Sequence, residues 1–122
     1  MKDFEEVPYD MMVSALAKPG NQIKESLTAD QAHLLHMAVG IAGEAGELLD
    51  AIKKHVIYNK PLDVINVIEE LGDLEFYMEG LRQAPEVATN RAVTLDLNQK
   101  KLAKRYHSLI YSDTHAQERK DK

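Results

Sequence analysis

The chain has 122 residues, no cysteine and a formal net charge of -5 at pH 7. This length fits a single domain, and the lack of cysteine excludes disulfides, thiolate zinc sites and thiol nucleophiles. The acidic balance argues against a general nucleic-acid binder, and no apolar run reaches the length of a transmembrane helix. The acidic N-terminus does not resemble a signal peptide, so a cytoplasmic location is expected.

The first half of the chain predicts one short and one long helix. The short helix is expected over residues 8–18, because Pro19-Gly20 follows and ends it. Thr28 and Gln31 have the spacing of a capping box, which starts a long helix that ends near Val56. An apolar stripe with the period of one helix face runs along this helix. Its members are Leu34, Ala38, Ile41, Ala45, Leu48 and Ile52.

The second half of the chain predicts two more helices. The turn-forming run Asn59-Lys60-Pro61 ends the long helix, and the next helix is expected over residues 62–83. Pro85 separates it from a last long helix over residues 86–110. Strand patterns are nearly absent throughout the chain.

These elements predict an all-α fold, an antiparallel helical bundle in one domain that spans the whole chain. Its core is expected at about residues 28–110, followed by a charged tail at about residues 111–122. On the third predicted helix, Ile65, Ile68 and Phe76 lie off the main apolar stripe. A second apolar face suggests burial against another subunit, so a homodimer or homotetramer is expected.

Two pairs of carboxylates stand at helical spacing on successive helices: Glu44 with Glu47, and Glu70 with Asp73. Residues three apart share a helix face, and each pair lies on the edge of its helix's apolar stripe. Antiparallel packing of the two helices would therefore bring four carboxylates together. Such a cluster must take up protons or bind a cation, and hard oxygen ligands favour Mg²⁺, with Mn²⁺ as a substitute.

Two other interpretations of these acids remain open. Helix surfaces are commonly charged, so each pair taken alone could be ordinary solvated charge. A di-iron carboxylate bundle usually has Glu-x-x-His on each of two helices. Here His33 and His36 precede Glu44, and neither stands three residues after a glutamate. The sequence favours these histidines as polar-face or packing residues.

The last predicted helix carries a basic face. Asn98, Lys101 and Arg105 fall on one side of it, where an amide and two cations can hydrogen-bond phosphate oxygens. Lys54 lies two turns after Glu47 on the same face of the long helix, within reach of a phosphate held at the carboxylates. Solvated or ion-paired surface charge is the alternative for these basic groups.

Together these motifs resemble those of the MazG-like all-α nucleoside triphosphate pyrophosphohydrolases. The motifs are Glu44-x-x-Glu47, Glu70-x-x-Asp73 and Asn98-x-x-Lys101-Leu-x-x-Arg105-Tyr106, in that order. Residues 111–122 resemble a C-terminal tail of some members. The resemblance covers about residues 28–122, and the ordered set of three motifs is more specific than the paired carboxylates alone.

The resemblance implies hydrolysis of a nucleoside triphosphate between its α and β phosphates, which gives a nucleoside monophosphate and pyrophosphate. All four carboxylates would hold Mg²⁺. Glu44 or Glu47 would accept the proton of the attacking water, with Glu69 as an alternative. Lys54, Lys101 and Arg105 would bind the β and γ phosphates. Asn98 would bind the substrate or a metal-bound water, and Tyr106 would bind the substrate.

Other activities are compatible with the same pattern. Phosphoribosyl-ATP pyrophosphohydrolases share the fold and the bond that is cleaved, and all-α dUTPases are a further candidate. A non-catalytic helical interaction module that binds a partner through its acidic face is the alternative from a different class. Magnesium-dependent release of pyrophosphate distinguishes an enzyme from such a module.

Overall fold

The computed structural model describes residues 3–118 and is built from helices. A short 3-10 helix, η1 (Phe4–Glu6), precedes the helices α1 (Tyr9–Leu16), α2 (Gly20–Ser26), α3 (Ala29–Val56), α4 (Val64–Arg82), α5 (Arg91–Arg105) and α6 (Asp113–Glu118). No strand occurs among the described residues, so the predicted all-α class is confirmed. None of these described helices has the length and apolar character that crossing a membrane requires.

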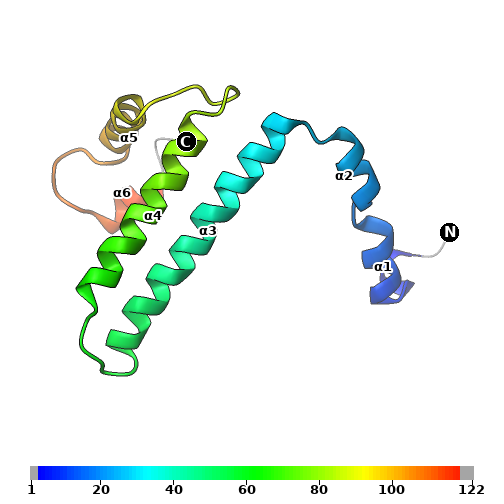
Figure 1. The fold of residues 1–122 in the computed structure, drawn as a ribbon, viewed down its shortest axis with the longest axis horizontal. Coiled ribbons are helices and arrows are strands. Elements are labelled where there is room, and N and C mark those ends of the chain that lie inside the picture. The colour runs from blue at the N-terminus through cyan, green and yellow to red at the C-terminus, as the bar shows by residue number, and fades with distance from the viewer. Residues whose placement is uncertain (1–2, 119–122) are drawn as a thin grey trace.

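Helices α3 and α4 form an antiparallel hairpin at the centre of the molecule (Figure 1). The predicted capping box starts α3, because the Thr28 hydroxyl accepts the Gln31 N–H at 3.1 Å and the Gln31 side chain accepts the Thr28 N–H at 3.0 Å. At the far end, Asn59 has a left-handed backbone with φ 55°. There the Lys60 N–H donates to the Lys54 carbonyl at 3.2 Å. Asparagine tolerates this conformation, so the chain can reverse into α4.

Glycines let α3 and α4 approach closely. A Cβ on Gly40 would overlap the ring of Tyr77, and a Cβ on Gly80 would overlap the sulfur of Met37. His33 spans the same interface, because its Nε2 lies 2.8 Å from the Gly80 carbonyl oxygen and donates to it. Of the two roles expected for His33, polar-face or packing residue, this contact fits the packing role. These contacts fix how the two helices lie against each other.

The bounds of α3 agree with the prediction, but the last predicted helix, residues 86–110, is wrong at both ends. Helix α5 covers only Arg91–Arg105. It starts late because Ala88 has a left-handed backbone with φ 45°, and because the Asn90 side chain caps the helix by accepting the Val93 N–H at 3.0 Å. It ends where the next residue takes an extended conformation.

The short helices α2 and α6 lie outside the predicted ones, as does the 3-10 helix η1. Helix α2 begins at Gly20, directly after Pro19, so the Pro-Gly pair that ends the first helix also starts the second. A proline is well tolerated at the start of a helix, because the first N–H groups have no partner within it. Helix α6 lies in the predicted charged tail, and the last residues of that tail, 119–122, lie outside the described residues.

The N-terminal arm, residues 4–26 with α1 and α2, stands away from the hairpin (Figure 1). The helices that pack closely are α3 with α4, and α5 with α6. Large apolar side chains of the arm, such as Tyr9 and Leu16, are therefore exposed. On α4 the second apolar face, with Ile65, Ile68 and Phe76, is exposed as well.

The hairpin contact can be tested by adding a methyl group at its tightest point. Gly40→Ala should destabilise the protein, because overpacking costs about 1–3 kcal/mol and alanine recovers only about 0.5–1 kcal/mol over glycine in a helix. Thermal unfolding followed by circular dichroism should show a lower Tm. Gly43→Ala is the matched control and should raise Tm, because nothing lies within 4 Å of a Cβ there. Equal changes in Tm for the two variants would contradict this packing.

Candidate metal centre

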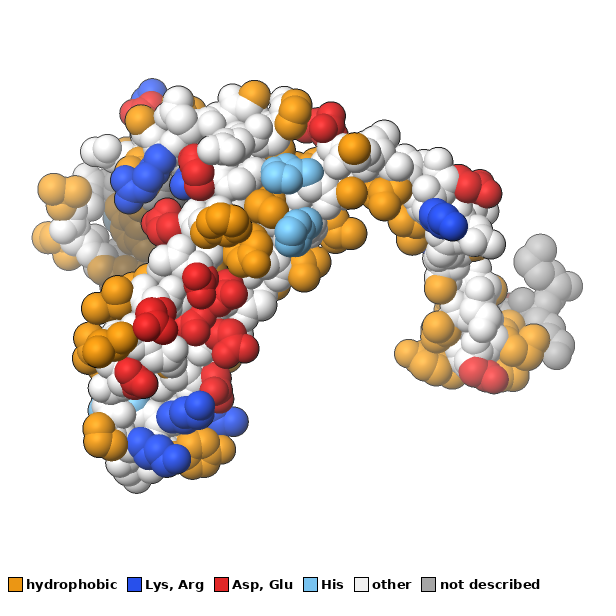
Figure 2. Space-filling model, viewed as in Figure 1, with side chains coloured by type: hydrophobic (Ala, Val, Ile, Leu, Met, Phe, Trp, Pro, Cys, Tyr) orange, Lys and Arg blue, Asp and Glu red, His pale blue; other side chains and the backbone are white. Residues whose placement is uncertain are grey.

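Three carboxylates meet midway along the hairpin. Glu44 comes from α3, and Glu70 and Asp73 come from α4; one oxygen of each lies within 4.8 Å of the others. Helical spacing places Glu70 and Asp73 on one face of α4, and the hairpin turns this face toward Glu44. Figure 2 shows the acidic side chains, in red, gathered over this part of the hairpin. The structure thus brings three of the four predicted acids together.

Glu70 is the most confined of the three acids. Its side chain is half-buried, and its Oε2 atom is shielded from solvent and has no hydrogen-bond partner among residues 3–118. The pKa of Glu70 is raised to about 7. The largest cause is a hydrogen bond with Glu44, because two carboxylates can share such a bond only when one of them carries a proton. Partial burial and the negative charges of Glu44, Asp73 and Glu47 raise the pKa further.

This arrangement fits a hard divalent cation. Carboxylates this close repel one another, so they remain ionised together only beside a positive charge. Carboxylate oxygens are the ligands that Mg²⁺ prefers, and Mg²⁺ usually needs only one or two of them because it keeps several waters. The unpartnered Oε2 of Glu70 is one oxygen that such a cation would satisfy. Glu44, Glu70 and Asp73 therefore form a candidate metal-binding triad.

Glu47 and Lys54 lie beside the triad rather than in it. Glu47 is exposed one turn after Glu44, and its charge contributes to the raised pKa of Glu70. Lys54 is held by Asp50, whose Oδ2 lies 3.0 Å from Nζ, and this contact, assisted by the charge of Glu47, raises the pKa of Lys54. The pairing of Lys54 with Asp50 was not predicted, although a spacing of four residues on a helix is the signal for such a pair.

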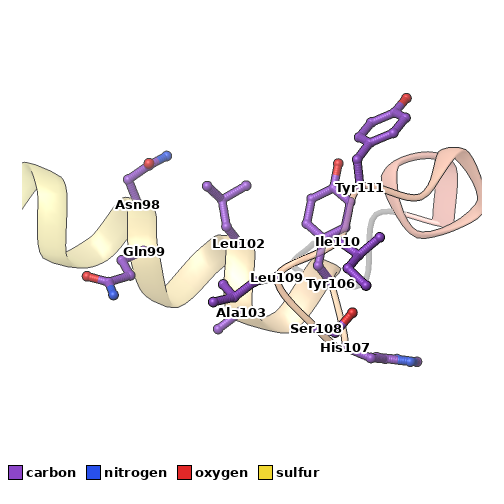
Figure 3. A pocket seen from close by; sticks show the side chains of 10 residues that line it. All are labelled: Asn98, Gln99, Leu102, Ala103, Tyr106, His107, Ser108, Leu109, Ile110 and Tyr111. Atoms are coloured by element: carbon purple, nitrogen blue, oxygen red, sulfur yellow. The ribbon is translucent and has the colours of Figure 1, made fainter.

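The predicted substrate-binding residues of α5 lie at a second place. Asn98 and Tyr106 line an open hollow of about 920 Å³ between α5 and the loop that follows it (Figure 3). The Tyr106 ring centroid lies 6.1 Å from that of Tyr111 on this loop. Lys101 and Arg105 belong to the same helix, which packs closely with α6 and not with the hairpin. Their role in phosphate binding remains a prediction.

Comparisons with known proteins give no relative of this chain. No family model matches it, no curated protein matches it, and no solved structure matches it. The likeness to MazG-like enzymes therefore rests on the motifs and on their order along the sequence. The structure itself establishes an all-α protein with an acidic cluster that could hold a metal ion.

Binding of Mg²⁺ should depend on pH through Glu70. The cation needs this carboxylate ionised, and its pKa is about 7. The affinity should therefore rise between about pH 6 and pH 8, with release of a proton near the middle of this range. Isothermal titration calorimetry in buffers of different ionisation enthalpy measures both quantities. Glu70→Gln should remove the proton release and most of the affinity, whereas a wild-type affinity that is constant over this range would exclude Glu70 as a ligand.

Proposed function

We propose that this protein is a magnesium-dependent nucleoside triphosphate pyrophosphohydrolase of the MazG-like kind. The observation that carries the proposal is the convergence of Glu44, Glu70 and Asp73, with one shielded and unpartnered oxygen on Glu70. Ordinary helix-surface acids spread into solvent, whereas these three crowd together at an electrostatic cost that a divalent cation offsets. The order of the three sequence motifs supports the choice of substrate class.

Hydrolysis between the α and β phosphates requires neutralised phosphate charge, a positioned water and a base. Magnesium would supply charge neutralisation and lower the pKa of water. Glu47 is the best placed of the candidate bases, because it lies next to the triad but is not one of the three converging carboxylates. The other two candidate bases are less well placed. Glu44 would be a ligand of the metal, and Glu69 lies about 100° around α4 from Glu70, so it does not share the face of the helix that carries the triad.

The outer phosphates of the substrate require cations. Lys54 lies two turns from Glu47, and Figure 2 shows Lys and Arg side chains, in blue, at the turn end of the hairpin next to the acidic cluster. A triphosphate would lie along the hairpin, with its α phosphate at the triad and its γ phosphate toward the turn. Lys101 and Arg105 would join it from a second subunit, because α5 does not pack closely on the hairpin of its own chain.

Release of pyrophosphate from a panel of ribo- and deoxyribonucleoside triphosphates tests the proposal. At least one substrate should yield pyrophosphate and the monophosphate with Mg²⁺, and EDTA should abolish the reaction. Glu70→Gln should lower kcat/KM by about a hundredfold or more and keep the helix content, since a metal supplies several kcal/mol of charge stabilisation. Glu75→Gln is the control on the same helix, because its exposed carboxylate points to Arg82 at 3.7 Å and should leave activity unchanged.

If no triphosphate is hydrolysed while Mg²⁺ still binds, the hydrolase proposal fails. The acidic face would then belong to an interaction module, the alternative of a different class. Equal losses in Glu70→Gln and Glu75→Gln would also contradict the assignment of the site.

The role of α5 can be tested in the same assay. Arg105→Ala should raise KM and lower kcat/KM by roughly ten- to a hundredfold, since a charge-assisted hydrogen bond is worth about 1.5–3 kcal/mol. Lys100→Ala is the control, because Lys100 Nζ pairs with Asp96 at 2.8 Å on the same helix. Full activity in both Arg105→Ala and Lys101→Ala would place the phosphate site elsewhere.

A further inference from the structure

The hollow beside α5 is lined by side chains that the metal centre does not use. It has a volume of about 920 Å³ and lies between the C-terminal half of α5 and the loop that follows this helix. Sites for small molecules are mostly apolar hollows of roughly 300–1,000 Å³ with a few polar groups. The hollow has this size and this kind of lining. Its aromatic and aliphatic lining residues are Leu102, Ala103, Tyr106, Leu109, Ile110 and Tyr111.

Two tyrosine rings form one end of the hollow. The ring centroids of Tyr106 and Tyr111 lie 6.1 Å apart. In Figure 3 the side chains of Asn98, Leu102 and Tyr106 project to the same side of α5, and the ring of Tyr111 lies beside that of Tyr106. Tyr111 is 71% exposed, so its ring is open to a ligand. Aromatic rings stack with their centroids about 4.5–7 Å apart, so a planar ring system in the hollow can contact both tyrosines.

Contacts with neighbouring residues hold both tyrosines in place. Tyr106 ends α5, where its N–H donates to the Leu102 carbonyl oxygen at 2.9 Å. The ring of His115 on α6 lies edge-on to the ring of Tyr106, with their centroids 6.2 Å apart. The Tyr111 hydroxyl donates to the carboxylate of Asp113, the first residue of α6. Side chains that are already ordered lose less conformational entropy when a ligand binds, so these contacts favour binding.

Polar groups on the same helix favour an anionic ligand over a purely apolar one. Helix α5 is strongly basic, although the whole chain has a net charge of -5. Arg105 follows Asn98 by seven residues, so the two lie on nearly the same side of the helix. A side-chain amide can hydrogen-bond the polar edge of a base, and a guanidinium group can bind phosphate. The basic residues of α5 are Arg91, Lys100, Lys101, Lys104 and Arg105, and its acidic residue is Asp96.

A single nucleotide matches this combination of groups. Its base is planar and can stack on tyrosine whichever base it is, because every base has a π face. Its phosphates are negative and complement the charge of α5. Asn98 and Tyr106 are eight residues apart, about 12 Å along the helix, which leaves room for a base and its sugar. The negative charge of the whole chain disfavours a long nucleic acid, so we expect a free nucleotide as the ligand.

We propose that this hollow binds the base of the nucleotide substrate, with the base stacked on Tyr106 and Tyr111 and the phosphates toward Lys101 and Arg105. The inference deepens the proposed function, and it rests on that function for the identity of the ligand as the substrate. Base binding itself requires neither the metal nor the carboxylate triad, because the hollow belongs to α5 and its following loop. It can therefore be measured separately from hydrolysis.

Isothermal titration calorimetry in EDTA with AMP, GMP, CMP, UMP and their deoxy forms tests the site. At least one monophosphate should bind the wild-type protein, and Glu70→Gln should bind it equally well. Tyr106→Ala and Tyr111→Ala should each weaken binding by about five- to a hundredfold, the usual effect of removing a stacked aromatic ring. Tyr106→Phe and Tyr111→Phe should bind nearly as well as the wild type, because the ring is retained. Tyr9→Ala is the control, because this exposed tyrosine lies in the N-terminal arm.

A second measurement does not depend on how the alanine variants fold. In NMR spectra of the wild-type complex, protons of the bound base should show nuclear Overhauser effects to the rings of both Tyr106 and Tyr111. No binding of any monophosphate, effects to other residues only, or wild-type affinity in both alanine variants would overturn the base site.

The two proposals fail in different ways. Binding through both tyrosines in a protein that hydrolyses no triphosphate would support the base site and contradict the hydrolase. Hydrolysis of triphosphates with unchanged KM in Tyr106→Ala and Tyr111→Ala would contradict the base site and support the hydrolase.

Discussion

The close packing of α3 against α4 is the constraint on which the rest of the structure depends. Gly40 beneath Tyr77 and Gly80 beside Met37 remove the side chains that would hold the two helices apart. Because the helices are this close, Glu44 on one can reach Glu70 on the other. The site is therefore a consequence of the hairpin contact and does not require any loop to order. Sites built on packed helices hold their geometry better than sites on loops.

The same packing brings carboxylates close enough to repel one another, and a bound proton or cation would relieve this repulsion. Glu70 has a shielded oxygen and two acidic neighbours at close range, and because its pKa is raised to about 7, a proton would compete with a bound cation for it near neutral pH. A scaffold that keeps such acids together, with no ion pair to a basic side chain among the described residues, is suited to binding an exchangeable cation. Asp73 is the exposed member of the triad, so the candidate site is open to solvent on its side.

The parts of this structure that could be predicted from the sequence are those that depend on nearby residues, such as helix caps and the spacing of side chains along a helix. The start of α3 follows from the Thr28 cap. Helical spacing predicts a group of four acids, Glu44, Glu47, Glu70 and Asp73, but it does not show that Glu47 lies beside the other three rather than among them. The start of α5 depends on the left-handed backbone of Ala88, which an alanine does not signal. Helix periodicity predicts which face of a helix is apolar, but it does not predict which other element packs against that face. The position of α5 relative to the triad could therefore not be predicted.

The most direct measurement of the central claim is an anomalous difference map from crystals grown with Mn²⁺ as a substitute for Mg²⁺. Three carboxylates acting as one site predict a single strong peak at about 2.0–2.2 Å from oxygens of Glu44, Glu70 and Asp73, with the remaining positions taken by water or by Glu47. Crystals of Glu70→Gln should lose this peak while the hairpin is unchanged. A well-ordered triad without a peak, or a peak held by other residues, would contradict the account.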